Sequence, residues 1–240
     1  MDNVIVTGAS RGLGLAIAER LAADGFRVVA VARKLSAPLE AAMARHPGAL
    51  LFMAFDLAET AGVADFVRRT RADIGPIFGL VNNAGISAEG LLANMPEADI
   101  ERLIRLNTLS PILVSKYVVR GMMAEGRGRV VNISSIVAAT GFNGLAVYSA
   151  TKASLVGFTK SLAREVGRVG VTVNAIAPGF VETELTKGLA GDERARVVAR
   201  SALKRLADPA DVAAMASFLM GEGGKNITGT VMTVDAGGTA

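Results

Sequence analysis

Two side chains in the second half of the sequence, a phenol and an ammonium, stand four residues apart at Tyr148 and Lys152. If this stretch is helical, both lie on one face. A phenol with an ordinary pKa of about 10 is a poor acid or base near neutral pH, and a neighbouring cation lowers that pKa by stabilising the phenolate. A shift of about three units corresponds to roughly 4 kcal/mol and requires a partly buried site. The pair is therefore a candidate acid–base unit, and an exposed pair on an amphipathic helix is the alternative.

A hydroxyl group joins this pair in the sequence pattern. Ser135 stands thirteen residues before Tyr148 and directly follows the apolar run Val130–Ser134. Ser134 points the other way if the strand continues, so we take Ser135 as the functional hydroxyl. In doubly wound sheets, ligands bind at the carboxyl ends of the strands. That rule gathers four segments at one edge: Gly8–Gly14, Asn82–Gly85, Ser135 and Pro178–Gly179.

Short apolar runs, which alternate with helical patterns, are the elements that must position these groups. Their near-continuous apolar character indicates strands buried on both faces, which is typical of a parallel sheet with crossover helices. We predict an α/β doubly wound Rossmann fold in which helices flank a seven-stranded parallel sheet. The seven predicted strands are Val4–Thr7, Val28–Ala32, Leu50–Phe55, Phe78–Val81, Val130–Ser134, Val171–Ala177 and Thr230–Val234.

Helix signals appear at both ends of the chain. Leu13, Ile17 and Leu21 recur every four residues and predict one apolar helix face, with Gly25 as the C-terminal cap. Near the other end, Asp208–Asp211 supplies a capping side chain, a first-turn proline and a first-turn acid.

The glycine-rich turn Gly8–Gly14 lies between the first strand and the first helix, where backbone N–H groups can bind a phosphate. An acid at the end of the second strand is typical of NAD sites, whereas the 2′-phosphate of NADP requires cations. Here that strand ends at Arg33 and Lys34 with no acid, and Arg11 lies in the glycine turn. The pattern favours NADP over NAD. The alternative for the glycine turn is a simple reversal of the chain from strand to helix. The alternative for Arg33 and Lys34 is that they are ordinary solvated charges.

Composition excludes several classes of protein. The chain has no cysteine and one histidine, so we predict no thiol catalysis, no disulfide and no metal site. The net charge of +4 is dispersed and tryptophan is absent, which argues against nucleic acid. The uncharged window 130–151 is too polar for a membrane span, and no secretory signal is evident, so we predict a cytoplasmic protein. With 240 residues and no linker, we predict a single NADP-binding domain over residues 1–240.

Together these motifs resemble those of the NADP-dependent branch of the short-chain dehydrogenase/reductase family, over essentially the whole chain. The segments that carry the resemblance are the cofactor loop Thr7–Gly14, the adenine-contacting pair Asp56–Leu57, the sheet-stabilising motif Asn82–Gly85, the tetrad Asn107, Ser135, Tyr148 and Lys152, and the nicotinamide-contacting segment Pro178–Thr183.

The resemblance implies the reduction of a carbonyl group. Tyr148 is then the acid, Ser135 holds the carbonyl oxygen, Lys152 lowers the pKa of Tyr148 and binds the nicotinamide ribose, and Asn107 positions a water that links Lys152 to solvent. The NADP(H)-binding residues that it implies are Gly8, Ser10, Arg11, Gly12, Leu13, Gly14, Arg33, Asp56, Leu57, Asn83, Ala84, Gly85, Tyr148, Lys152, Pro178, Gly179, Val181 and Thr183.

Within the family, the segments Ala163–Val166, Val173–Phe180 and Val234–Gly238 are most similar to 3-oxoacyl-acyl-carrier-protein reductases. The resemblance thus implies a 3-oxoacyl thioester as substrate, a role in fatty acid synthesis and acyl carrier protein as partner. The alternative substrates are another small ketone, a sugar or an alcohol. A catalytically silent NADP-binding sensor is a further alternative, and the complete tetrad argues against it.

The resemblance also implies how partners bind. Basic residues beside the mouth of the site dock the carrier in such reductases, and Arg127, Arg129 and Arg168 fall near those places, although Arg127 and Arg168 are each displaced by one position. Family members of this length form homotetramers through helices that here span about 100–123 and 148–167, and through the C-terminal region.

A substrate lid is expected at about 182–205. It carries apolar residues beside several arginines, a pattern that suits an apolar chain with a negative or phosphorylated end, and a solvated helix face is the alternative. The apolar residues are Leu185, Leu189, Val197 and Val198.

Overall fold

The computed structural model of the chain describes residues 1–181 and 191–240. Its centre is a parallel sheet of seven strands in the order β3-β2-β1-β4-β5-β6-β7. The predicted fold is therefore confirmed, and each of the seven apolar runs forms a strand. Their bounds are β1 (Asn3–Thr7), β2 (Arg27–Ala32), β3 (Leu50–Ala54), β4 (Ile77–Asn82), β5 (Gly128–Ile133), β6 (Val171–Pro178) and β7 (Val231–Val234).

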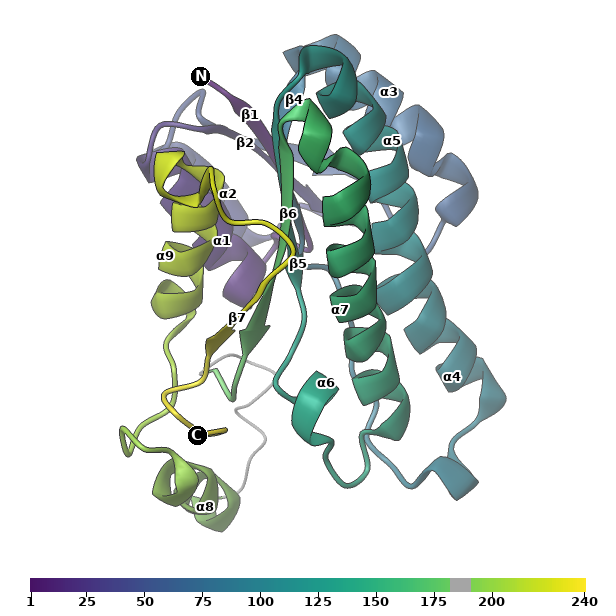
Figure 1. Ribbon diagram of the computed structural model, residues 1–240, viewed down its shortest axis with the longest axis vertical. Coiled ribbons are helices and arrows are strands. Elements are labelled where there is room, and N and C mark those ends of the chain that lie inside the picture. The colour runs from purple at the N-terminus through teal and green to yellow at the C-terminus, as the bar shows by residue number, and fades with distance from the viewer. Residues whose placement is uncertain (182–190) are drawn as a thin grey trace.

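Helices cover both faces of the sheet (Figure 1). One face carries α1 (Gly12–Ala23), α2 (Ala37–Arg45) and α9 (Pro209–Met220). The opposite face carries α3 (Val63–Ile74), α5 (Ser110–Glu125) and α7 (Ala146–Val166), and α4 (Glu97–Ile104) precedes α5 and packs beside α7. The short helix α6 (Val137–Thr140) and α8 (Gly191–Arg200) lie beyond the ends of the last strands.

Each face of the sheet has its own apolar core. Along β1, Val4 and Val6 pack into one cluster with helix α1, whereas Ile5 packs into the other with Phe66 of α3. These side chains are at most 1% exposed. Burying a side chain of this size contributes about 1.5–3 kcal/mol. Successive residues thus face two cores, which explains why the strands read as continuous apolar runs.

The predicted helix signals are confirmed at both ends of the chain. Ile17 and Leu21 of α1 are fully buried, and Gly25 follows the helix with a φ of 94°, its N–H bonding back to the last turn. At the start of α9, the Asp208 carboxylate accepts a hydrogen bond from the Ala210 N–H at 2.9 Å, and the Asp211 carboxylate accepts one from the Asp208 N–H at 2.9 Å. These reciprocal bonds fix where α9 begins.

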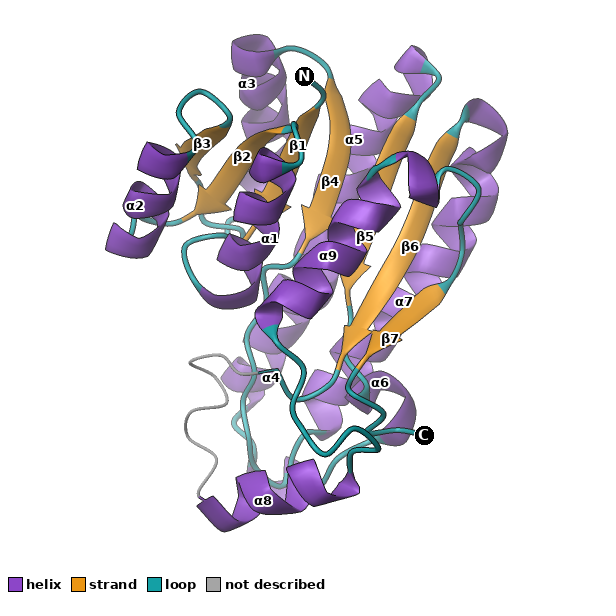
Figure 2. Ribbon diagram, turned by 90° about the vertical axis from the view of Figure 1, so that its left-hand side faces the viewer, coloured by secondary structure: helices purple, strands orange, loops and turns teal. Residues whose placement is uncertain are grey.

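The strand order reverses between β1 and β4, which are neighbours in the sheet although β2 and β3 separate them in sequence. All seven strands point the same way, and their carboxyl ends face the region of α6 and α8 (Figure 2). A sheet of this kind binds ligands at that edge, beside the reversal.

Within the described part of the chain, no helix combines the length and apolar character that a membrane span requires. The same residues contain no group of three or more histidine, aspartate or glutamate side chains that could hold a metal ion.

Candidate active site

The glycine turn is held against the end of β4. The Thr7 hydroxyl accepts hydrogen bonds from the N–H groups of Asn83 and Ala84 at 2.9 and 3.0 Å, and it donates one to the Val81 carbonyl at 3.2 Å. The Asn83 amide donates to the Thr7 carbonyl at 2.9 Å. The two segments therefore form one unit at the point where the strand order reverses.

Two glycines of the turn are required by close contacts. A Cβ on Gly8 would lie 2.8 Å from the Cα of Ala84, and a Cβ on Gly14 would lie 2.3 Å from the Gly8 carbonyl oxygen. Gly8 and Gly12 also have positive φ angles, of 68° and 55°. The N-terminus of α1 has no side-chain cap, so its first-turn N–H groups are available to a phosphate. This cradle fits the diphosphate of a dinucleotide.

A second loop brings cations to the same cradle. The Ser36 hydroxyl donates to the Ser10 carbonyl and accepts a hydrogen bond from the Leu39 N–H, so it caps α2 and ties that loop to the glycine turn. Arg33 and Lys34, just before it, are exposed. Among the residues that the structure describes, neither side chain has an ion-pair or hydrogen-bond partner.

The predicted adenine-contacting pair follows β3. The Asp56 carboxylate accepts a hydrogen bond from the Ala58 N–H at 2.9 Å, and Leu57 is 6% exposed. The N–H of Phe55 bonds to the Ala32 carbonyl at 3.0 Å, which places this turn beside the end of β2.

The structure brings Ser135, Tyr148 and Lys152 together. Ser135 follows β5, and Tyr148 and Lys152 lie one turn apart near the start of α7. The hydroxyls of Ser135 and Tyr148 are hydrogen-bonded. The Lys152 Nζ lies 5.7 Å from the centre of the Tyr148 ring and donates to the Ile133 carbonyl at 2.9 Å. The helical reading of this stretch is confirmed, and the alternative of an exposed lysine is excluded because Lys152 is 5% exposed.

The electrostatics of the pair differ from the sequence-based expectation. Burial raises the pKa of Tyr148, and the hydrogen bond from Ser135 offsets part of that rise. Burial also lowers the pKa of Lys152 to about 8. The expected lowering of the Tyr148 pKa by Lys152 is therefore wrong for this structure, because removal from water penalises the phenolate more than its neighbours stabilise it. The consequence is a phenol that keeps its proton at neutral pH.

Asn107 ties three segments together behind this cluster. It lies in a π-helical turn, Arg105–Leu109, between α4 and α5, and is 1% exposed. Its Oδ1 accepts from the Ile86 N–H at 2.9 Å, and its Nδ2 donates to the Ile86 carbonyl at 2.8 Å and to the Thr151 hydroxyl at 3.2 Å. Single π-helical turns are frequent at functional sites. Oδ1 keeps one acceptor position, because a carbonyl oxygen has two lone pairs.

Gly85 marks where Asn107 and Lys152 meet. A Cβ at this glycine would lie 3.2 Å from the Asn107 Oδ1 and 3.4 Å from the Lys152 Nζ. A larger residue would therefore crowd both polar groups.

A chain of buried amides and hydroxyls anchors α7 to the sheet. The Asn82 amide donates to Asn132 on the adjacent strand at 2.8 Å and to Ser115 of α5 at 2.9 Å. The Asn132 amide in turn donates to the Thr159 hydroxyl of α7 at 2.8 Å. This network fixes the helix that carries Tyr148 relative to the strand that precedes Ser135.

Ser134 is a residue whose contribution the sequence did not reveal. The strand β5 ends at Ile133, so the alternation expected for Ser134 and Ser135 does not extend to them. The buried Ser134 hydroxyl donates to the backbone carbonyl of Lys152 at 2.9 Å. With the Ile133 carbonyl on the Lys152 Nζ, two consecutive residues hold both ends of the lysine. No sequence signal identifies this contact, because its acceptor is a backbone group.

The segment after β6 lies at the same edge. The buried Pro178 accepts a hydrogen bond from the Ile136 N–H at 3.0 Å, and the Gly179 N–H donates to the Val234 carbonyl at 2.9 Å. Val181 is buried and bridges to Ala207. Thr183, Leu185 and Leu189 lie outside the described residues, and of the expected lid the structure describes α8 and the turn that follows it.

The arginines expected beside the mouth of the site lie elsewhere. Arg127 and Arg129 are at the start of β5, whereas Ser135 follows its end, about 20 Å away at the usual rise per residue. Arg168 lies beyond the C-terminal end of α7, and Tyr148 lies near the N-terminal end. Arg129 is also buried, with its guanidinium 5.5 Å from the centre of the Phe78 ring. The expectation that these arginines lie beside the mouth of the site is therefore wrong for this chain.

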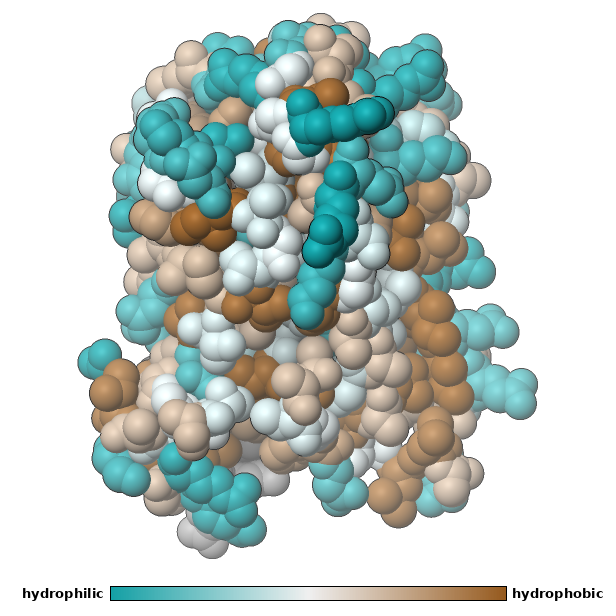
Figure 3. All heavy atoms as spheres, in the orientation of Figure 1, coloured by the Kyte–Doolittle hydropathy of each residue, from teal (hydrophilic) through white to brown (hydrophobic). Residues whose placement is uncertain are grey.

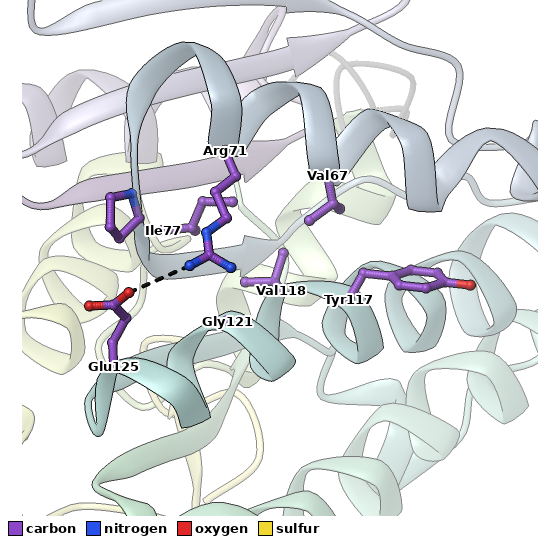
Figure 4. A pocket seen from close by; sticks show the side chains of 8 residues that line it. Val67, Arg71, Ile77, Tyr117, Val118, Gly121 and Glu125 are labelled. Atoms are coloured by element: carbon purple, nitrogen blue, oxygen red, sulfur yellow. Dashed lines mark ion pairs between the residues drawn. The ribbon is translucent and has the colours of Figure 1, made fainter.

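A cavity between α3 and α5 is not a substrate site. It has a volume of about 20 Å³, enough for a water molecule, and an ion pair of 3.5 Å between Arg71 and Glu125 crosses it (Figure 4). It also adjoins Ile77, at the start of β4 and so at the opposite edge of the sheet from Ser135. Tyr117, the second tyrosine of the chain, points away from the arginine.

Known proteins are similar in sequence to this chain over most of its length. The family model described as short chain dehydrogenase matches residues 2–194. The 3-oxoacyl-acyl-carrier-protein reductase FabG of Escherichia coli strain K12 is 39% identical over 236 residues, which cover 97% of this chain and 95% of that protein. The 3-oxoacyl-acyl-carrier-protein reductase MabA of Mycobacterium bovis is 36% identical over 237 residues, with coverages of 98% and 92%.

A solved structure shares the architecture. A gluconate 5-dehydrogenase from Burkholderia cenocepacia, solved in complex with NADP and tartrate, matches with a TM-score of 0.94 and 30% sequence identity. The match covers 99% of this chain and 95% of that one. Because the family model spans most of the sequence and these relatives match over nearly their full lengths, the chain belongs to the short chain dehydrogenase family.

Proposed function

We propose that this protein is an NADPH-dependent reductase that converts a ketone to a secondary alcohol, with a 3-oxoacyl thioester as its substrate. The observation that carries the proposal is the meeting of the Ser135 hydroxyl, the Tyr148 phenol and the Lys152 ammonium beside the glycine cradle. The identity of 39% to a reductase that acts on 3-oxoacyl-acyl-carrier-protein supports the substrate class.

The residues around the cradle fit NADP(H). The glycine turn and the N-terminus of α1 would hold the diphosphate, and Asp56 and Leu57 would contact the adenine. Arg33 and Arg11 are exposed cations on two loops joined by the Ser36–Ser10 hydrogen bond, and they would bind the 2′-phosphate. The relative from Burkholderia cenocepacia, which was solved with NADP, supports this assignment.

At the nicotinamide end, Asn83, Ala84 and Gly85 would flank the ring together with Pro178, Gly179, Val181 and Thr183. Lys152, held by the Ile133 carbonyl, has its ammonium directed toward Gly85 and would bind the ribose hydroxyls. When bound, the reduced nicotinamide supplies the hydride for the carbonyl carbon.

Side chains of the protein bind the carbonyl oxygen and protonate it. The Ser135 hydroxyl donates a hydrogen bond to that oxygen and thereby fixes the carbon for attack. The Tyr148 phenol keeps its proton at neutral pH and transfers it to the oxygen as negative charge develops there. The Lys152 ammonium would supply the proton that restores the phenol, and the free acceptor position of Asn107 would hold a water that connects the lysine to solvent.

An NADPH-consumption assay tests the function. We expect the purified protein to reduce an acetoacetyl group on coenzyme A and the same group on acyl carrier protein, with the higher kcat/KM on the carrier. Simple ketones should be reduced more slowly. Turnover confined to free ketones would keep the reductase chemistry and overturn the thioester assignment.

The second candidate function is oxidation or reduction of a sugar acid. The TM-score of 0.94 to a gluconate 5-dehydrogenase favours it, and the exposed Arg196 and Arg200 of α8 suit a carboxylate. Gluconate with NADP, and 5-ketogluconate with NADPH, belong in the same assay. A kcat/KM for the sugar acid above that for every thioester would select this candidate.

A pH dependence follows from Lys152. Because burial lowers its pKa to about 8, we expect kcat/KM for reduction to fall as the pH rises through about 8, when the ammonium loses the proton it must pass on. Below that pH the group is charged and the rate should be level. Rates measured across neutral and alkaline pH check this. A Lys152→Arg variant keeps its charge and should be slower without showing that fall. An unchanged fall in the variant would assign it to another group.

Ser134 is proposed as a positioning residue. Replacing it with Ala removes one buried hydrogen bond to the Lys152 carbonyl, worth about 1 kcal/mol, so kcat should fall about fivefold with KM nearly constant. The pH at which the rate falls should also shift, because Lys152 loses one of the hydrogen bonds that hold it in place. A Ser134→Thr variant retains the hydroxyl and should recover most of kcat. Loss of stability with kcat and the pH profile intact would limit Ser134 to a structural role.

We further propose a homotetramer of single-domain subunits that works in the cytoplasm, with residues 182–205 as a lid over the site. Ile104, Leu109 and Met123 along α4 and α5 are 39–48% exposed, and hydrophobic residues are exposed on that side of the molecule (Figure 3). Apolar surface of this kind supports association. Light scattering after gel filtration tests the tetramer. Fractionation of cells tests the cytoplasmic location.

A further inference from the structure

Two phenylalanines meet at the edge of the sheet where the strands end, one on the loop before α7 and one after β6. The ring centroids of Phe142 and Phe180 lie 5.8 Å apart with an angle of 64° between the ring planes, an edge-to-face arrangement. The Phe142 side chain is 46% exposed and Phe180 is half-buried. We call these two rings the aromatic wall.

The loop that carries Phe142 is fixed on both sides. The Leu145 N–H donates to the Phe142 carbonyl at 3.1 Å and closes a turn, and the Gly90 N–H donates to the Gly144 carbonyl at 3.0 Å. Gly141 and Gly144 have φ angles of 66° and 78°, which allow the chain to reverse tightly. An exposed hydrophobic residue is ordinary by itself. This ring, however, is held at a defined place by its backbone and by a partner ring.

That place borders the reacting groups. Phe142 lies on the loop whose ends are Ser135 and Tyr148. Phe180 follows Pro178, whose carbonyl accepts a hydrogen bond at 3.0 Å from the backbone N–H of the residue after Ser135. Ser135, Tyr148 and Phe180 are half-buried, whereas Phe142 is exposed, so Phe142 is the part of the wall that faces solvent. A bound substrate would meet it with the part that leads away from the carbonyl.

We propose that the aromatic wall is a subsite for the apolar acyl chain of the substrate and that Phe142 sets the preference for chain length. Two hydrocarbon rings offer no hydrogen-bonding group, so they leave the hydroxyl groups of a polyhydroxylated substrate without partners and suit an apolar chain better. An acyl chain gains about fourfold in affinity for each methylene that it buries. The identity of the ketone rests on the proposed function, but the apolar character of the subsite does not.

The test is the dependence of kcat/KM on chain length for Phe142→Ala, measured with acetoacetyl, 3-oxooctanoyl and 3-oxododecanoyl thioesters of coenzyme A. We expect the two longer substrates to lose at least about tenfold and the short one about twofold, since a phenyl ring covers more than one methylene. A Phe142→Leu variant should fall between. The matched control is Phe218→Ala, which removes an equally exposed ring (48%) from α9 and should keep the wild-type profile.

Binding supplies a readout that does not depend on turnover. Calorimetry should show that Phe142→Ala weakens the affinity for 3-hydroxydodecanoyl-coenzyme A about as much as it lowers kcat/KM, and affects 3-hydroxybutyryl-coenzyme A far less. Equal losses for short and long chains, or no loss for either, would overturn the proposed subsite.

Failure of the proposed function has a different signature. If the wild-type protein reduces no 3-oxoacyl thioester, that function is wrong, and the subsite is then tested with methyl ketones of increasing alkyl length. A steeper gain with length in the wild type than in Phe142→Ala would uphold the subsite on its own. Identical slopes in the two proteins would overturn it.

Discussion

Replacing Tyr148 with Phe should lower kcat for ketone reduction about 1,000-fold, the midrange effect of losing a general acid. The substitution keeps the ring that packs against Lys152 and removes only the hydroxyl that bonds to Ser135. The dissociation constant of NADPH should therefore change by no more than about fivefold, the value of one hydrogen bond. Single-turnover kinetics and titration of NADPH fluorescence measure the two effects separately.

Tyr117→Phe is the matched control for this experiment. It removes the hydroxyl of the second tyrosine in the chain, which lies on α5, where it lines the small cavity between α3 and α5 with its ring directed away from Arg71 (Figure 4). The control should retain wild-type kinetics. A Tyr148→Phe protein that bound NADPH normally and kept full turnover would remove Tyr148 from the mechanism.

Replacing Arg33 with Ala should lower kcat/KM for NADPH about 10- to 100-fold, because a charge-assisted hydrogen bond to a phosphate contributes about 1.5–3 kcal/mol. NADH lacks the 2′-phosphate, so its kcat/KM should change by less than about twofold. Arg33 suits this role because, among the described residues, nothing pairs with it. Steady-state kinetics with both cofactors give the ratio directly.

Arg168→Ala controls for the loss of a positive charge. Arg168 is exposed and lies beyond the far end of α7 from Tyr148, so its removal should leave the ratio of NADPH to NADH efficiency unchanged. Equal losses for both cofactors in Arg33→Ala, or a wild-type protein that uses NADH better than NADPH, would contradict the assignment of the 2′-phosphate site.

Much of the fold could be predicted because its causes are local or periodic. Strands such as β1 face two cores, and their sequences are therefore continuous apolar runs. The cap of α9 involves only the four consecutive residues Asp208–Asp211, so the sequence shows it directly. The meeting of Ser135 with Tyr148 and Lys152 followed from one topological rule, because the carboxyl ends of parallel strands lie at one edge.

What could not be predicted depends on groups that distant segments bring together. Ser134 acts on a backbone carbonyl, and backbone groups look alike in every sequence. The raised pKa of Tyr148 reflects burial by several elements, so a single neighbouring cation was a poor guide. The expected places of Arg127 and Arg168 came from the family resemblance, whereas the predicted strand Val130–Ser134 already separates Arg127 from Ser135.

The aromatic wall links these observations to the choice of substrate. The relatives include reductases of 3-oxoacyl-acyl-carrier-protein and a gluconate 5-dehydrogenase, so similarity alone leaves an apolar and a polar substrate open. Phe142 and Phe180 favour the apolar one.

The most direct test of the account is the mass of the product formed from acetoacetyl-coenzyme A and NADPH deuterated at both C4 positions of the nicotinamide. The wild-type protein should form a 3-hydroxybutyryl thioester that carries one deuterium, and this product should be nearly absent with Tyr148→Phe. Recovery of unreduced acetoacetyl-coenzyme A from the wild-type protein, or a reduced product without deuterium, would contradict it.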